Sequence, residues 1–155
     1  MCLIVDANVA PLVFAPPPRG EFLPAHRALM AGKAAAVRGG TRLNQEYNRL
    51  GRLRRVLIEF DRRGALRAVS DGEVDETEAC LKRAGECRSD DQHIIALARV
   101  SGARLLCSHD ADLHADFTNP ALLSPRGSVY QSRSHRPLLA RVCGRCPRCR
   151  RKAGG

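Results

Sequence analysis

The segment RSDDQHIIALARVSGARLLCSHDAD, residues 88–112, is the part of this chain from which the fold class is most readily predicted. Ser89 and Gln92 have the spacing of a helix capping box, so a helix is predicted to open at Ser89 with the neighbouring aspartates in its first turn. Gly102 is placed to end that helix, and the apolar run Ala103–Cys107 predicts a buried strand directly after it. A helix, a glycine and a buried strand form the second half of a βαβ unit, which indicates a parallel sheet.

The chain before this stretch shows the same alternation of strands and helices. Cys2–Val5 and Lys33–Val37 predict two more strands, and Ala65–Val69 predicts a short strand at the edge of the sheet. Between the last two, apolar residues recur at helical spacing from Thr41, and Gly64 closes this helix. The predicted fold is α/β, with three layers (α/β/α) around a parallel central sheet.

One further helix is predicted between the edge strand and residue 88. Asp75 and Glu78 have capping-box spacing, which places the start of the helix at Asp75. Gly85 then ends it.

Charge divides the chain into two parts. Residues 1–116 contain 17 Lys and Arg and all 16 Asp and Glu, whereas residues 117–155 contain 9 Lys and Arg and no acid. With the change in composition after Asn119, this predicts an α/β domain over residues 1–119 and a basic, cysteine-containing extension over residues 120–155, partly flexible. A basic extension favours a polyanionic partner such as nucleic acid. A solvated tail that aids solubility is the alternative.

No segment predicts a membrane span or a signal peptide. No run approaches the roughly 20 apolar residues of a span, and Asp6 interrupts the apolar N-terminus without a basic leader before it. We therefore expect a cytoplasmic protein with no membrane partner. In that compartment the seven cysteines are expected to be reduced thiols or metal ligands.

Acidic residues stand at the ends of the predicted elements. Six share this placement: Asp6, Glu46, Asp90, Asp91, Asp110 and Asp112. A parallel sheet gathers the ends of its strands at one edge, so we expect these acids to lie close together. Two carboxylates 4 Å apart repel by roughly 4 kcal/mol at an effective dielectric of about 20, so the cluster needs either a cation or raised pKa values. Hard oxygen ligands favour Mg²⁺ or Mn²⁺ over zinc.

Several of these residues also have a structural interpretation. Asp6 or Asn8 could cap a short helix after the first strand, and Glu46 could face solvent beside an arginine. His109 could touch a substrate phosphate or simply belong to a loop. His93, inside a helix, is more typical of a packed residue than of a ligand.

Four segments together resemble the PIN domain, a family of metal-dependent nucleases. They are LIVDANV (3–9), LNQEYNRL (43–50), SDDQHIIALARVSGARLL (89–106) and CSHDADL (107–113), and the resemblance covers roughly residues 2–118. It implies four acids that hold Mg²⁺ or Mn²⁺ for RNA cleavage: Asp6, Glu46, Asp91 and Asp110. It also implies that Ser108 and Asn8 support the site. Asp90 can replace Asp91 in register, and Asp112 is similar to an auxiliary acid of many members.

The resemblance implies an endoribonuclease that cleaves RNA with a metal-activated water. Many short family members are toxins that a small antitoxin protein inhibits, and similar domains are commonly homodimers. This chain departs from them in its basic extension, which leaves the toxin role open. Two alternatives are an RNA-binding protein that keeps the fold without catalysis, and a DNA nuclease acting in repair or defence.

The extension ends in a cysteine motif. Cys143, Cys146 and Cys149 could bind a structural Zn²⁺, for which His135 is the nearest fourth ligand in sequence, with Cys107 or a partner chain as others. The alternative is a tail that contacts RNA or whose cysteines have no role. A third hypothesis is a zinc-dependent regulator built on this tail. The basic residues expected to bind nucleic acid are Arg145, Arg148, Arg150 and Arg151.

Overall fold

A computed structural model of the chain describes residues 1–140. The cysteine motif at 143–149 and the arginines predicted to bind nucleic acid, Arg145, Arg148, Arg150 and Arg151, lie outside the described residues.

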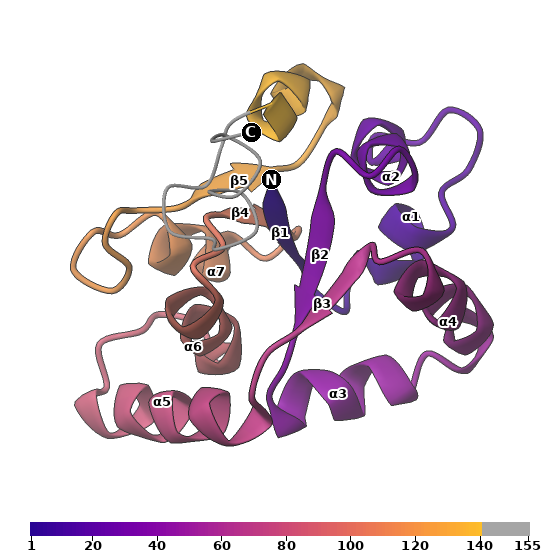
Figure 1. Ribbon diagram of the computed structural model, residues 1–155. Helices are drawn as coiled ribbons and strands as arrows, with labels where there is room; N and C mark the ends of the chain where they lie inside the picture. Colours follow the sequence, from indigo (N-terminus) through magenta and orange to yellow (C-terminus); the bar gives the residue numbers. More distant parts are fainter. Residues whose placement is uncertain (141–155) are drawn as a thin grey trace, which may run out of the picture.

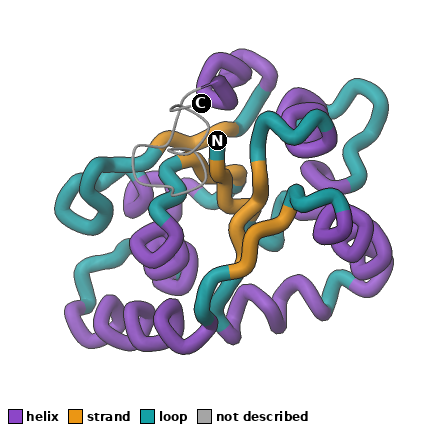
Figure 2. Tube along the Cα trace, viewed as in Figure 1, coloured by secondary structure: helices purple, strands orange, loops and turns teal. Residues whose placement is uncertain are grey.

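Five parallel strands form one sheet at the centre of the molecule (Figure 2). In spatial order they are β3 (Leu66–Ala68), β2 (Ala35–Arg38), β1 (Cys2–Val5), β4 (Leu105–Cys107) and β5 (Ser128–Tyr130). Every residue of β1 and β4 is buried, as expected of strands covered on both faces. The predicted α/β class with a parallel central sheet is confirmed.

Helices cover both faces of the sheet. They are α1 (Ala10–Phe14), α2 (Leu23–Met30), α3 (Thr41–Asn48), α4 (Arg54–Arg62), α5 (Asp71–Ala84), α6 (Gln92–Ser101) and α7 (Ala111–Phe117), with 3-10 helices η1 (Gly51–Leu53) and η2 (Arg133–Ala140). Figure 1 shows α1, α2 and α4 on one side and α5, α6 and α7 on the other. No helix within residues 1–140 has the length and apolar character that a membrane crossing requires.

The helix predicted from Thr41 to Gly64 is broken into two. α3 ends at Asn48, and Leu50 adopts φ −86° and ψ 52°, outside the helical region, before η1 and α4 follow. The break redirects the chain so that Leu57 and Phe60 of α4 reach the core, where Phe60 packs edge-on against Phe14.

The expected start of α5 at Asp75 is wrong, because the helix begins at Asp71 with Ser70 as its cap. Asp75 instead accepts hydrogen bonds from the Thr41 backbone N–H (2.8 Å) and from its hydroxyl group (2.6 Å). Asp71 accepts another from the Gly40 N–H, at 2.8 Å. Two carboxylates of α5 therefore cap α3, whose own N-cap, Gly40, has no side chain to do so.

The sheet continues past residue 119, where the change in composition predicts the end of the domain. β5 pairs with β4 in parallel register, and Tyr130 at its end is fully buried. The Tyr130 hydroxyl donates to the carbonyl oxygen of Glu21, just before α2. The fold therefore needs residues up to at least Tyr130; a three-residue strand within a polar segment leaves too weak a pattern for the sequence to mark this boundary.

Candidate metal centre

Strands β1 and β4 place the first two site residues side by side. Val5 lies opposite Cys107, so the chain leaves the two strands at neighbouring points, with Asp6 and Ser108 as the next residues. The Ser108 hydroxyl donates to Asp6 Oδ2 at 2.8 Å, and the Asp6 residue is only 5% exposed. Burial raises the pKa of Asp6, the hydrogen bond from Ser108 opposes that rise, and the charge of Glu46 adds to it.

Ser108 also positions the next acid. Its Oγ accepts a hydrogen bond from the Asp110 backbone N–H at 3.1 Å. Asp110 Oδ1 in turn caps α7 by accepting from the N–H groups of Asp112 and Leu113. Its second oxygen, Oδ2, has no hydrogen-bond partner among residues 1–140. The side chain of Asp112 is exposed in the first turn of α7.

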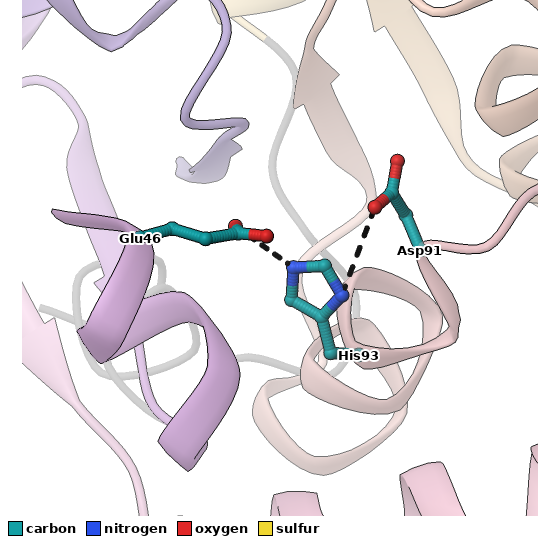
Figure 3. A group of neighbouring side chains, drawn as sticks. All are labelled: Glu46, Asp91 and His93. Carbon is teal, nitrogen blue, oxygen red and sulfur yellow. Dashed lines mark hydrogen bonds and ion pairs between the residues drawn. The ribbon is translucent and has the colours of Figure 1, made fainter. Parts of the chain in front are cut away.

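Helices α3 and α6 supply the other half of the cluster. Figure 3 shows the His93 ring of α6 between Glu46 of α3 and Asp91, the residue before α6. His93 Nε2 lies 3.2 Å from Glu46 Oε2, and Nδ1 lies 4.0 Å from Asp91 Oδ1. The potential ligand atoms of these three residues all lie within 4.8 Å of one another.

His93 is buried with one ring nitrogen unpaired. The residue is 1% exposed, and Nδ1 has no hydrogen-bond partner within residues 1–140. Burial lowers the pKa of His93 to about 4, and the charge of Arg42 lowers it as well, so the ring is neutral at pH 7. In the tautomer with its proton on Nε2, His93 donates a hydrogen bond to Glu46. Its Nδ1 atom then has a free lone pair on the side of Asp91. A carboxylate that fixes a histidine in this tautomer is a common arrangement behind metal ligands.

The four acids that the resemblance singles out act on one another. The pKa of Asp91 rises to about 6, first because of burial and next because of the charge of Asp6. Arg42 opposes this rise, while the charges of Asp110 and Glu46 add to it. Asp91 therefore lies within electrostatic reach of the other three acids, while the group of possible ligand residues within 4.8 Å among residues 1–140 consists of Glu46, Asp91 and His93, without Asp6 or Asp110.

Arg42 is a member of the site that sequence reasoning missed. Its Nε lies 3.5 Å from Glu46 Oε1, and its Nη2 lies 3.3 Å from Asp91 Oδ1. Its Nη1 donates to the Asp90 carbonyl oxygen. The only signal in the sequence was its position four residues before Glu46, which is equally typical of a pair on a helix surface.

The structure distinguishes Asp90 from Asp91. The Asp90 side chain is exposed, whereas Asp91 faces Arg42 and His93. The expected cap by Ser89 does not form, and both aspartates precede the helix, which starts at Gln92. Ser89 instead donates through its N–H and its hydroxyl group to Asp116 Oδ2, each at 2.9 Å.

The side chains of the remaining candidates form no hydrogen bond or ion pair with these acids within residues 1–140. Asn8 is exposed and has no side-chain hydrogen bond within residues 1–140. The ring of His109 packs against Phe22, with ring centroids 5.3 Å apart. His135 Nδ1 accepts from the Gln131 N–H at 3.0 Å. Cys107 is fully buried in β4, and burial raises the pKa of its thiol to about 12, which disfavours the thiolate that a zinc ligand requires.

Comparison with models of known protein families finds no match, and comparisons with curated proteins and with solved structures find none either.

Proposed function

We propose that this protein is an endoribonuclease of the PIN-domain type that depends on Mg²⁺ or Mn²⁺. One observation carries the proposal. The charges of Asp6, Asp110 and Glu46 all raise the pKa of Asp91, so the three acids that complete the family-like set act on it, and Glu46, Asp91 and His93 bring possible ligand atoms within 4.8 Å of one another. A cluster of this kind at the carboxyl edge of a parallel sheet is where α/β enzymes place their ligands.

The donor atoms present fit a hard divalent ion. Asp6, Asp91 and Asp110 offer carboxylate oxygens, and burial, together with the charges of neighbouring acids, raises the pKa of both Asp6 and Asp91. The unpaired Nδ1 of buried His93 adds a nitrogen donor beside Asp91. Imidazole suits Mn²⁺ better than Mg²⁺, so we expect Mn²⁺ to support the higher activity. When bound, such an ion activates water and offsets negative charge on a phosphodiester.

The protein side chains have distinct roles in this proposal. Ser108 fixes the orientation of Asp6, and the α7 cap fixes Asp110 while leaving its second oxygen available. Glu46 is held by Arg42 and His93, and burial raises its pKa. A glutamate with a raised pKa is a better proton acceptor, so Glu46 is suited to orient and deprotonate the attacking water.

The test is cleavage of a labelled single-stranded RNA with Mn²⁺, with Mg²⁺ and with EDTA. Asp6→Asn is expected to lower the cleavage rate at least about 100-fold, because it removes a metal-binding charge while keeping the side-chain shape. Asp61→Asn is the matched control, because Asp61 is exposed on α4, outside the cluster. Equal rates for wild type and Asp6→Asn would refute the proposal.

The same experiment separates the alternatives. A matched single-stranded DNA is digested in parallel, because the 2′-hydroxyl group distinguishes the two substrates. Preference for DNA would make the protein a DNA nuclease, and tight RNA binding without cleavage would make it a binding protein.

The biological setting stays a prediction. The four cysteines within residues 1–140 are free, which supports the expected cytoplasmic location. A small antitoxin as inhibitor and a homodimer are likewise predictions. Arrest of growth on expression of wild type but not of Asp6→Asn would support the toxin role.

A further inference from the structure

A basic hollow lies between α2 and η2, separate from the acid cluster. It has a volume of about 590 Å³ and is lined by residues of α2, of the turn after it, and of η2. α2 and η2 pack against each other at the top of the view in Figure 1, where η2 is the unlabelled yellow helix. We call this feature the α2–η2 hollow.

Four cations line the hollow without an acid among the lining residues. They are Arg27, Lys33, Arg133 and Arg136, and all four are exposed. Within residues 1–140 none of them forms an ion pair, whereas Arg42, Arg62 and Lys82 elsewhere each lie beside a carboxylate. Gathered charges of one sign attract a polyanion and raise its local concentration. The hollow is therefore built to receive negative charge.

The remaining lining indicates which anion fits. Leu23, Pro24 and Leu139 provide an apolar wall beside the cations. Guanidinium groups match phosphate oxygens with two parallel hydrogen bonds. No aromatic residue lines the hollow, so it offers no platform on which bases stack. This combination favours a nucleic-acid backbone held without regard to base sequence.

Residues next to the hollow contact the segment that carries Asp110. Phe22, the residue before α2, packs against His109, which stands between Ser108 and Asp110. Arg133 at the start of η2 donates through its backbone N–H to Glu21, at 2.9 Å. These contacts fix the hollow relative to the end of β4. Ala140 also lines the hollow, and the sequence after it, residues 141–155, contains six further Lys and Arg.

We propose that the α2–η2 hollow binds the phosphodiester backbone of single-stranded RNA and holds the substrate outside the acid cluster. The identity of RNA as the substrate rests on the proposed function. Binding itself needs neither a metal nor the acids, so it can be tested separately from cleavage.

The test measures binding of a labelled single-stranded RNA by fluorescence anisotropy, in EDTA and at several salt concentrations, with the full chain. Arg27→Gln/Arg136→Gln is expected to weaken binding about tenfold and to reduce the slope of log affinity against log salt by about 1.4, since each phosphate contact to a single strand contributes about 0.7. Arg27→Lys/Arg136→Lys keeps both charges and is expected to keep most of that slope.

The matched control is Arg83→Gln/Arg126→Gln, which removes two exposed charges outside the hollow and the cluster. If the hollow variant and this control bind RNA equally well, the inference is overturned. Tighter binding of a polyglutamate peptide than of RNA of equal charge would overturn it in favour of an acidic protein partner. If wild type cleaves no RNA but the hollow variant still binds more weakly than the control, the proposed function fails and the hollow stands as an RNA-binding site.

Discussion

Asp91 and His93 lie side by side, and burial moves their pKa values in opposite directions. The pKa of Asp91 rises from 3.8 to about 6, so between these values the folded protein keeps a proton that the unfolded chain has released. Asp91 therefore makes stability fall as pH rises through this range. The pKa of His93 falls from 6.5 to about 4, so the unfolded chain holds a proton that the folded protein lacks. His93 makes stability rise over nearly the same range, and the two contributions oppose each other.

Removal of Asp91 should expose the contribution of His93. In EDTA, the free energy of unfolding of Asp91→Asn minus that of wild type is expected to rise by about 2 kcal/mol from pH 4 to pH 6.5, because only wild type has the falling contribution of Asp91. Urea denaturation at steps of half a pH unit measures this difference. Asp90→Asn is the control, because the exposed Asp90 side chain should follow wild type. A constant difference between Asp91→Asn and wild type would contradict the raised pKa of Asp91.

Arg42 supplies positive charge to the cluster in the absence of a metal ion. Because its guanidinium lies beside Glu46 and Asp91, Arg42→Gln is expected to lower metal-free stability by about 1 kcal/mol. The increase in Tm on addition of Mn²⁺ should be larger than in wild type, since the ion then relieves more repulsion. Arg52→Gln, an exposed change in η1, should alter neither quantity. Equal Mn²⁺ shifts for Arg42→Gln and wild type would argue against this role.

For single residues, the sequence predicts which acids belong to the site better than it predicts which side chains contact them. Asp6 and Asp110 follow buried apolar runs, so their meeting at one sheet edge follows from strand ends alone. Arg42 and His93 could not be assigned, because helical spacing does not reveal whether a polar side chain faces solvent or another helix. The choice of Asp91 over Asp90 depends on Ser89 binding Asp116, a contact between residues far apart in the sequence.

Among the elements, the turn before α6 is held by one buried carboxylate. Asp116 of α7, 2% exposed, accepts hydrogen bonds from the backbone N–H groups of Arg88 and Ser89 and from the Ser89 hydroxyl group. This contact fixes the turn that carries Asp91, so α7 positions a site residue without entering the site.

Asp116→Asn tests this anchor. An asparagine offers one acceptor oxygen and turns an NH₂ group towards the remaining donors, so a loss of about 3 kcal/mol in stability is expected. Chemical denaturation measures the loss, and the affinity for Mn²⁺ should fall with it because Asp91 is no longer held. Asp112→Asn, an exposed change on the same helix, is the control for stability. A loss no larger than that of the control would show that the anchor contributes little.

The helices also show where periodicity stops being informative. Leu43 and Tyr47 in α3 and Leu57 and Phe60 in α4 all face the core, so the apolar stripe continues across a break in the backbone. Periodicity reports burial and not continuity. In the same way, capping-box spacing at Asp75 identified a capping residue but not the helix that it caps.

For the whole molecule, the position of β5 predicts different outcomes for two C-terminal truncations, a difference that composition alone does not predict. Ending the chain after Asn119 removes β5 and buried Tyr130, so cooperative unfolding is expected to be lost. Ending it after Ala140 keeps every described element, so cooperative unfolding is expected to remain, with a Tm within about 2 °C of wild type. Thermal denaturation followed by circular dichroism distinguishes the two.

The chain that ends after Ala140 also tests whether the basic residues beyond it bind nucleic acid. Removal of residues 141–155 eliminates six Lys and Arg, so the salt dependence of RNA binding should become shallower. An unchanged slope would show that this segment does not contact nucleic acid.

Because α5 caps α3, these two helices are expected to unfold locally together. α3 carries Glu46 and Arg42, is capped by carboxylates of α5, and packs with α6, whereas Asp6 and Asp110 belong to the ends of strands in the sheet. An ion held by both groups would join segments that otherwise can open separately. Amide hydrogen exchange in α3 should then slow more on addition of Mn²⁺ than exchange in α4, a readout of ion binding that needs no substrate.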